Sequence, residues 1–282
     1  MLPLTIGDAA EATGGRAVFG DTDARLDITS VTSDSREARP GALFLCFRGE
    51  KADGHSFAAD AFARGAVCAV AEREPDGAPG PYILVGSTAE ALAKLGARYR
   101  SRLKIPVVGV VGSVGKTTAK EMIATVLSER YDVLKTQGNL NNELGVPLTL
   151  LQADAEHGAA VVEMGISDFG EMTRLAEMAR PGICVVTAIA PCHLEKLGDL
   201  RGVLRAKAEI FPLMPKNGAA VVNGDDELLR AYDTGVEKIT FGLGARCGWR
   251  AENIVSDGTE SVSFDLISPP GKRVRAMIPA YG

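Results

Sequence analysis

Residues 104–128 constrain the fold of this chain more than any other segment, because they predict a strand, a glycine loop and a helix in succession. Residues 105–111 form an almost wholly apolar run rich in valine, which is typical of a buried parallel strand. Residues 112–118 follow at once, with two glycines, a lysine and two threonines. The predicted helix then places four apolar side chains on one face, namely Met122, Ile123, Val126 and Leu127.

This succession is the setting that a phosphate-binding loop requires. Gly112 and Gly115 allow backbone N–H groups to approach an anion, and the N-terminus of the helix adds a positive dipole. Lys116 is placed to reach the β- and γ-phosphates of a nucleotide, and the hydroxyl of Thr117 to bind Mg²⁺. Val110 stands where the common motif has its first glycine, so a plain glycine turn is the alternative.

The composition excludes several classes of protein. The 282 residues suffice for two ordinary domains, and 46% hydrophobic and 24% charged residues are typical of a globular chain. With a net charge of −5 and no basic run, nucleic acid is not expected as a partner. No apolar run approaches the roughly 18 residues of a membrane span, and the N-terminus lacks a signal-like core. A cytoplasmic protein without membrane insertion is therefore expected.

The cysteines and histidines give no independent sign of a metal centre. The five cysteines are scattered, and three of them lie in apolar strand-like runs, which predicts buried reduced thiols. The three histidines are too widely spaced to indicate a zinc site.

Residues 1–103 are predicted to form a small α/β domain. Its strands are expected at residues 28–33, 42–47 and 66–71, and its helices begin near Thr5, Ser56 and Ser87. Polar residues gather in two loops that follow strands, and these include Ser35, Arg36, Asp53 and His55. The two loops indicate either a partly cationic site for an anionic ligand or solvated turns.

A second domain, residues 104–282, is predicted to contain a mostly parallel sheet covered by helices. Short strands at 158–164, 183–189 and 218–223 alternate with helices at 169–179 and 200–211. From residue 247 on, the alternation predicts antiparallel strands at 249–255, 261–267 and 273–278. The predicted fold class is therefore α/β, with a small N-terminal α/β domain before a mostly parallel-sheet domain that ends in a small antiparallel extension.

Polar residues stand after the strands of the second domain, at the sheet edge where ligands bind. Glu163 suits Mg²⁺, which prefers oxygen ligands, although a surface or capping acid is the alternative. His193 is compatible with a second metal, with phosphate, or with a hydrogen-bonded loop histidine. An asparagine-rich run at 136–151 suits neutral polar ligand groups, and a long turn before a helix is its alternative.

Several of these stretches together resemble the Mur ligase family of bacterial cell-wall synthesis. They are VGSVGKTTAKEM, GNLNNELGVPLTLL, VEMGIS, IAPCHLEKLGDLRGVLRAKAEIF and VVNGDD. The N-terminal TSDSREARPGALFLCFRGEKADGHSF is similar to the family's uridine-nucleotide-binding domain. Within the family, the asparagine-rich run favours the branch that adds D-Ala-D-Ala over the branches that add D-Glu, L-Ala or a diamino acid.

The resemblance implies a role for each candidate residue. The ATP site would consist of Gly112, Ser113, Val114, Gly115, Lys116, Thr117, Thr118 and, at the adenine, Asn223. Thr117 and Glu163 would hold Mg²⁺, and His193 a second metal. Catalysis would involve Lys116, His193 and Lys207, which matches a lysine that family members carry as a carbamate. Substrate binding would involve Ser35, Arg36, Asp53 and His55 near the uridine diphosphate, and Asn139 and Asn142 between ATP and the acceptor peptide.

The implied activity is ATP-dependent amide ligation in peptidoglycan precursor synthesis, with ATP and Mg²⁺ as cofactors, by a monomer. The terminal carboxylate of UDP-N-acetylmuramoyl-tripeptide would attack the γ-phosphate of ATP and form an acyl phosphate. The amine of D-Ala-D-Ala would then displace phosphate. Catalysis would come mainly from positioning and charge neutralisation.

The resemblance also implies that the family continues into a third domain beyond residue 282. These residues alone are therefore expected to bind the UDP substrate but to ligate little. The alternatives are another Mur ligase with a different acceptor, a folylpolyglutamate-synthase relative, and a non-catalytic nucleotide-binding module. The uridine-site stretch argues against the folate branch, and the lack of an N-K-x-D motif argues against a GTPase.

Overall fold

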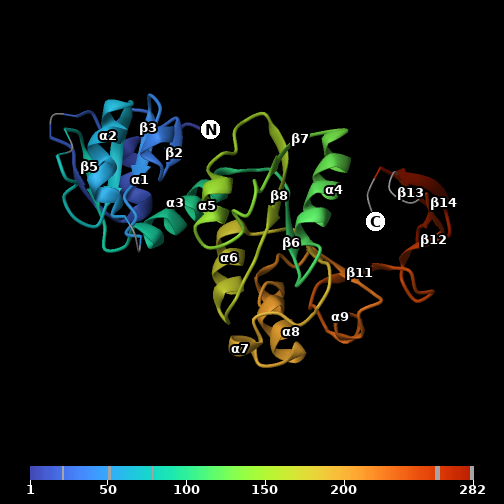
Figure 1. Ribbon diagram of the computed structural model, residues 1–282. Helices are drawn as coiled ribbons and strands as arrows, with labels where there is room; N and C mark the ends of the chain where they lie inside the picture. The colour runs from blue at the N-terminus through green and yellow to red at the C-terminus, as the bar shows by residue number, and fades with distance from the viewer. Residues whose placement is uncertain (21, 50–51, 78, 258–260, 280–282) are drawn as a thin grey trace. The chain divides into compact units, whose positions relative to one another are not determined.

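The computed structural model describes residues 1–20, 22–49, 52–77, 79–257 and 261–279. The chain folds into two compact units, each assembled from several segments, and Figure 1 labels most of their helices and strands. Unit 1 comprises Met1–Val107, Lys120–Met164 and Arg174–Arg180, and unit 2 comprises Val108–Ala119, Gly165–Thr173 and Pro181–Gly282. The predicted domain boundary near residue 103 stays a prediction.

A five-stranded sheet with the order β1-β5-β4-β3-β2 organises the N-terminal part of unit 1. Strands β2 to β5 run parallel, and β1 is antiparallel to β5. Because the parallel strands share a direction, the loops after β2, β3 and β4 leave the sheet at one edge. The elements are α1 (Ile6–Thr13), β1 (Arg16–Val18), β2 (Ser30–Thr32), η1 (Ser35–Glu37), β3 (Ala42–Leu45), η2 (Gly54–Phe57), α2 (Ala58–Ala63), β4 (Ala66–Ala71), β5 (Tyr82–Leu84) and α3 (Thr88–Arg102).

Small side chains form the core on one side of this sheet. Seven alanines, Cys46 and Phe44 form a buried cluster, and the partly buried rings of Phe62 and Tyr82 pack against this cluster. Two predicted helix starts are confirmed, since Thr5 and Asp8 make a reciprocal capping box and Ser87 accepts from the N–H of Glu90. The helix predicted from Ser56 is instead the 3₁₀ turn η2 followed by α2.

The remainder of unit 1 lies around the parallel pair β7 (Asp132–Lys135) and β8 (His157–Glu163). It also holds α5 (Gly145–Leu150), most of α4 (Lys116–Ser128) and the end of α6 (Glu171–Ala179). In α4 the buried side chains are Lys120 and Ala124, whereas Met122 and Val126 are 40% and 72% exposed. The apolar face that the sequence predicts for this helix is therefore not its buried face.

Unit 2 contains a sheet in which β11, β10, β9 and β6 follow one another and run parallel. β12 runs parallel to β11 and then pairs antiparallel with β13, which pairs antiparallel with β14. The predicted antiparallel extension is confirmed, whereas β11 was not predicted. The elements are β6 (Val107–Val111), β9 (Ile183–Val186), α7 (Leu194–Leu197), α8 (Leu200–Ala208), η3 (Phe211–Leu213), β10 (Ala219–Asn223), α9 (Glu227–Ala231), β11 (Glu237–Gly242), β12 (Trp249–Ser256), β13 (Val262–Ile267) and β14 (Arg273–Ile278).

The cysteines are all free thiols, as predicted, and four of the five are buried. Burial raises the pKa of Cys46, Cys68 and Cys184 to about 12. Cys192 is half-buried. Thiols with such a raised pKa stay protonated near neutral pH and act as small core residues.

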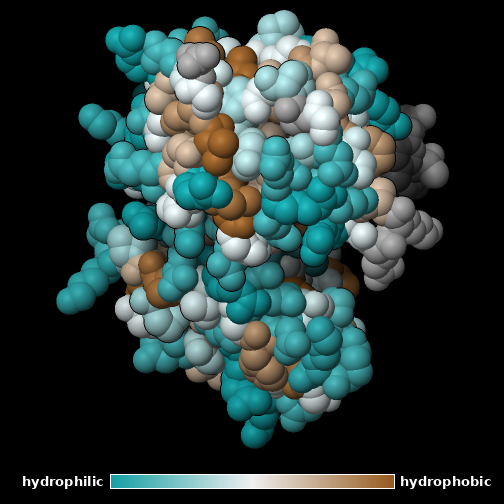
Figure 2. All heavy atoms as spheres, turned by 90° about the vertical axis from the view of Figure 1, so that its left-hand side faces the viewer, coloured by the Kyte–Doolittle hydropathy of each residue, from teal (hydrophilic) through white to brown (hydrophobic). Residues whose placement is uncertain are grey.

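The surface in Figure 2 is mainly hydrophilic, and hydrophobic residues gather on this face only in small groups. A pattern of this kind is ordinary for a protein surface and marks no large docking patch on the face shown. Within the described ranges, no helix combines the length and the apolar character needed to cross a lipid bilayer.

Candidate functional site

The loop between β6 and α4 requires glycine at two positions, for different reasons. Gly112 has a φ of 151° and Gly115 a φ of 75°, in the region that L side chains rarely adopt. A Cβ on Gly112 would also overlap the Oγ1 of Thr187, whereas a Cβ on Gly115 would meet no heavy atom within 4 Å. Gly112 is thus needed for both packing and conformation, and Gly115 for conformation alone.

The segment after β9, residues 187–192, braces this loop within unit 2. The N–H of Ser113 donates to the carbonyl of Ala188 (2.8 Å), and its Oγ accepts from the N–H of Ala190 (3.0 Å). The hydroxyl of Thr187 donates to the carbonyl of Val114 (2.5 Å). No sequence pattern reveals this brace, because Thr187 and Val114 lie 73 residues apart.

Lys116 is the first residue of α4, and its side chain folds back over the loop. Its Nζ donates to the carbonyl of Gly112 (3.1 Å). Thr117 and Thr118 lie exposed in the first turn of the same helix. The ammonium and the positive end of the helix therefore converge on the glycine backbone and create a surface that attracts anions.

Lys207 lies in α8 and is only 3% exposed. Burial lowers the pKa of its ammonium, and Lys116 lowers it further, while Cys192 acts in the opposite direction. A lowered pKa shifts the amine toward its neutral, nucleophilic form. The structure thus brings two predicted site residues of unit 2, Lys116 and Lys207, within electrostatic reach of each other.

His193 and Asn223 lie at the ends of other elements of unit 2. His193 precedes α7 with a φ of 50°, and its side chain is 46% exposed, with Nδ1 4.0 Å from Oε1 of Glu195. Asn223 ends β10, and its Oδ1 accepts from the N–H of Asp225 (3.0 Å). Asp226 was not predicted as a site residue, yet its carboxylate caps α9 and accepts from the N–H of Ile189 (2.8 Å) in the bracing segment.

In unit 1, the three asparagines of the asparagine-rich run have three different positions. Asn139 is exposed, and Asn142 accepts from the N–H of Gly145 (2.9 Å) at the start of α5. The amide of Asn141 donates to Oε1 of Glu163 (2.8 Å). Glu163 ends β8 and is 2% exposed. Asn139 and Asn142 were the predicted candidates, but Asn141 makes the contact with the candidate metal ligand.

Glu163 offers a carboxylate oxygen, which is the kind of ligand that Mg²⁺ prefers. In the described part of the chain, no three or more His, Cys, Asp or Glu side chains group together as a metal site. This donor set fits Mg²⁺ held by one carboxylate together with phosphate oxygens and water, rather than an all-protein cage. The joint metal site predicted for Thr117, Glu163 and His193 stays a prediction, because these residues belong to different units.

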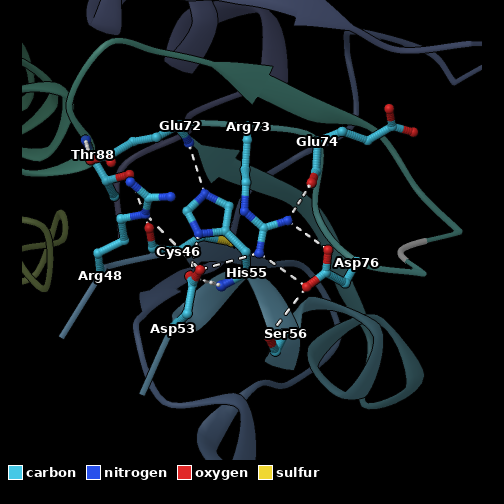
Figure 3. Close-up of polar contacts among 10 residues, drawn as sticks. All are labelled: Cys46, Arg48, Asp53, His55, Ser56, Glu72, Arg73, Glu74, Asp76 and Thr88. Carbon is cyan, nitrogen blue, oxygen red and sulfur yellow. Dashed lines mark hydrogen bonds and ion pairs between the residues drawn. The ribbon is translucent and has the colours of Figure 1, made fainter. Parts of the chain in front are cut away.

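At the carboxyl edge of the five-stranded sheet, Asp53 and His55 form the centre of a polar network (Figure 3). His55 is fully buried, and its Nδ1 donates to Oδ1 of Asp53 (2.5 Å) while its Nε2 accepts from the N–H of Glu72 (2.9 Å). Arg73 donates to Asp53 (3.1 Å) and to Asp76 (3.0 Å). The bonds from His55, aided by Arg73, hold the pKa of Asp53 well below its ordinary value. Since both ring nitrogens of His55 bond within the protein, His55 orients Asp53.

Two exposed guanidinium groups lie in the loops that follow β2 and β3. Arg36 pairs with Asp34 (Nε–Oδ1 2.9 Å), and its side chain is 81% exposed. The pairing lowers the pKa of Asp34 to about 2. Arg48 lies 4.0 Å from Asp53 and is 64% exposed, while Ser35 is buried. Guanidinium groups of this kind suit the oxygens of a diphosphate.

Family models match most of the chain. The Mur ligase middle domain matches residues 110–282, and the catalytic domain of the Mur ligase family matches residues 27–100. The chain belongs to the Mur ligase family. This finding agrees with the resemblance seen in the sequence and with the braced glycine loop of unit 2.

Mur ligases of one kind are prominent among its relatives. The UDP-N-acetylmuramoyl-tripeptide–D-alanyl-D-alanine ligase of Escherichia coli (strain K12) is 35% identical over 295 residues, covering 100% of this chain and 62% of the relative. A crystal structure of MurF from Acinetobacter baumannii matches with a TM-score of 0.89 and 33% identity, over 99% of this chain and 61% of that one. The MurF ligase from Thermotoga maritima in complex with ADP matches with a TM-score of 0.79 and 29% identity, over 90% and 58%. The chain thus spans about three fifths of the length of these relatives.

Proposed function

We propose that the protein is an ATP-dependent ligase that joins D-Ala-D-Ala to UDP-N-acetylmuramoyl-tripeptide. The observation that carries the proposal is the braced glycine loop, over which Lys116 folds and near which the amine of Lys207 is buried. Such a site suits the phosphates of a nucleotide. The choice of substrates is supported by the relative from Escherichia coli, whose name states this activity.

In this proposal the nucleotide lies along the start of α4. Residues 112–118 bind the phosphates of ATP, Lys116 neutralises the γ-phosphate, and Asn223 contacts the adenine. Thr117 and Glu163 hold Mg²⁺, and His193 serves a second ion. Bound there, Mg²⁺ offsets the phosphate charge that otherwise repels an incoming carboxylate.

The proposed reaction proceeds in two steps. A carboxylate oxygen of the tripeptide attacks the γ-phosphorus of ATP, the bond to the β-phosphate oxygen breaks, and ADP leaves. The amine of D-Ala-D-Ala then attacks the acyl carbon of the acyl phosphate, loses a proton, and phosphate leaves. Asn139 and Asn142 lie beside the acceptor peptide in this arrangement. The protein accelerates both steps by holding the reacting groups close together.

Lys207 carries a carbamate in this proposal. A neutral amine is the form that reacts with CO₂, and the pKa of Lys207, lowered by burial, supports that form. The carbamate converts a cation into an anionic oxygen ligand that orients a metal ion. Its formation is tested by ¹³C NMR of the protein in ¹³C-bicarbonate, with Lys207→Met as the control.

The uridine diphosphate is proposed to bind at the carboxyl edge of the five-stranded sheet, near Ser35, Arg36, Asp53 and His55. The exposed guanidinium groups of Arg36 and Arg48 support this placement. His55 contributes by holding Asp53 in place. The protein is proposed to act in the cytoplasm as a monomer.

Two binding measurements and one assay test this function. We expect calorimetry to detect binding of both ADP–Mg²⁺ and UDP-N-acetylmuramoyl-tripeptide. Lys116→Met should abolish the first, and the exposed Lys104→Met should leave both unchanged. Failure to bind either nucleotide would overturn the proposal.

Phosphate release then distinguishes the acceptors. In the whole protein we expect release to require UDP-N-acetylmuramoyl-tripeptide and D-Ala-D-Ala together. Release with D-Glu, L-Ala or a diamino acid in place of D-Ala-D-Ala would assign a different Mur ligase activity. The same assay tests the expectation that the 282 residues alone ligate little.

A further inference from the structure

Glu163 is held from its backbone side by a buried network in unit 1. Its N–H donates to Oγ1 of Thr136 (3.0 Å), and Thr136 is fully buried. The carbonyl of Thr136 in turn accepts from Nζ of Lys120 (2.8 Å), which is 1% exposed. The backbone at the end of β8 is therefore fixed by buried hydrogen bonds.

The amide of Asn141 contacts the carboxylate of Glu163 itself. Its Nδ2 lies 2.8 Å from Oε1 of Glu163. A carboxylate accepts hydrogen bonds and cannot donate them, so the nitrogen of the amide must face it. The terminal torsion of a glutamate is intrinsically broad, so a hydrogen bond to one carboxylate oxygen favours the orientations that keep it.

The turns on both sides hold Asn141 in this position. The N–H of Asn141 donates to the carbonyl of Asn139 (2.7 Å), and the N–H of Leu140 donates to the carbonyl of Gln137 (3.1 Å). On the other side, Asn142 caps α5 through Gly145. Of the three asparagines in this run, Asn141 is thus the one whose amide contacts Glu163, and the hydrogen bonds of the neighbouring residues hold it there.

We propose that Asn141 is a positioning residue that orients the carboxylate of Glu163 for Mg²⁺. The inference rests on the proposed function, in which Glu163 binds the metal beside the nucleotide. Partners that orient a metal ligand typically change metal affinity by about 10- to 100-fold when they are removed. Asn141→Ala is therefore expected to raise the Mn²⁺ concentration that half-saturates nucleotide binding by about tenfold.

The test measures binding of a fluorescent ADP analogue as Mn²⁺ is titrated, so that it does not depend on turnover. Gln137→Ala is the matched control, because it removes an exposed carboxamide from the same loop and should leave the Mn²⁺ midpoint unchanged. Asn141→Ser keeps a small polar residue suited to the turn but is too short to reach Glu163, and it should shift the midpoint as Asn141→Ala does. Circular dichroism confirms that each variant is folded.

The outcomes separate this inference from the proposed function. If the unmodified protein binds no nucleotide with Mn²⁺, the proposed function fails. If it binds but Asn141→Ala and Asn141→Ser behave as Gln137→Ala does, the inference is wrong. An equal loss of nucleotide binding with and without Mn²⁺ would also overturn it, because the amide would then merely shape the loop.

A double-mutant cycle gives the sharpest outcome. In a Glu163→Gln background, Asn141→Ala should produce no further shift of the Mn²⁺ midpoint, because its effect passes through the carboxylate. An unchanged tenfold shift in that background would show that Asn141 acts on the metal by another route.

Discussion

Replacing Gly112 by alanine should destabilise unit 2 through two separable effects. A non-glycine residue held at a φ of 151° is strained by about 1–3 kcal/mol. The added Cβ would also overlap Oγ1 of Thr187, a β-branched side chain whose hydroxyl is bonded to Val114. Overpacking of this kind costs about 1–3 kcal/mol more. The expected loss is therefore about 2–6 kcal/mol in the free energy of unfolding.

Removing the hydroxyl that causes the overlap separates the two effects. In a Thr187→Ala background, the nearest atoms to the new Cβ are Cβ of residue 187 at 3.2 Å and the nitrogen of Ala188 at 3.3 Å. There, Gly112→Ala should cost only the strain of about 1–3 kcal/mol. Urea unfolding of the four proteins in the cycle measures the difference, which should exceed the roughly 0.5 kcal/mol of ordinary additivity error.

The second glycine of the loop, Gly115, provides the control for strain without overlap. Gly115→Ala, at a φ of 75° in open space, should cost about 1–2 kcal/mol and should be unaffected by Thr187→Ala. Equal costs of Gly112→Ala in both backgrounds would refute the reasoning, because the overlap with Thr187 would then contribute nothing.

Three further predictions concern the polar networks. His55→Ala should lower the free energy of unfolding by about 2–4 kcal/mol in urea, because it removes the acceptor of the half-buried N–H of Glu72 and leaves a cavity where the fully buried ring was. A loss no larger than that of the exposed Arg36→Ala would contradict this. The pKa of Asp53 is lowered in the folded state. The ionised carboxylate therefore stabilises the folded protein at pH values above 3.8, the ordinary pKa, and this stabilisation is lost progressively as the pH falls below 3.8. Thermal unfolding between pH 5 and pH 2 should show that loss, and Asp53→Asn should reduce it. Glu209→Ala should lower the free energy of unfolding in urea by about 1–2 kcal/mol, because the carboxylate of Glu209 accepts from the N–H groups of Gly170 (2.9 Å) and Thr173 (3.2 Å) at the start of α6. An unchanged unfolding midpoint would rule out this capping role.

The sequence alone predicted the elements whose determining interactions are local. The capping box of Thr5 and Asp8 joins residues three positions apart. The strand, glycine loop and helix at residues 104–128 and the antiparallel extension after residue 247 follow from short patterns of the same kind, and the structure contains both. Strand β11 was missed because it lies between two loops and carries charged residues at its start.

Only the tertiary structure decided which side chains are buried and which partners they find. The apolar pattern of α4 predicts a face with Met122 and Val126, but the buried residues are Ala124 and Lys120. The ammonium of Lys120 donates to the carbonyl of Thr136, sixteen residues away. Likewise, the sequence does not distinguish the three asparagines, whereas in the structure the turns around them place Asn141 against Glu163, which lies 22 residues further along the chain. Capping and turn preferences depend on atoms within a few residues of each other, so they can be predicted from a short stretch of sequence. The surroundings of a side chain depend on what a distant strand or turn places opposite it, and this is settled only when the chain has folded.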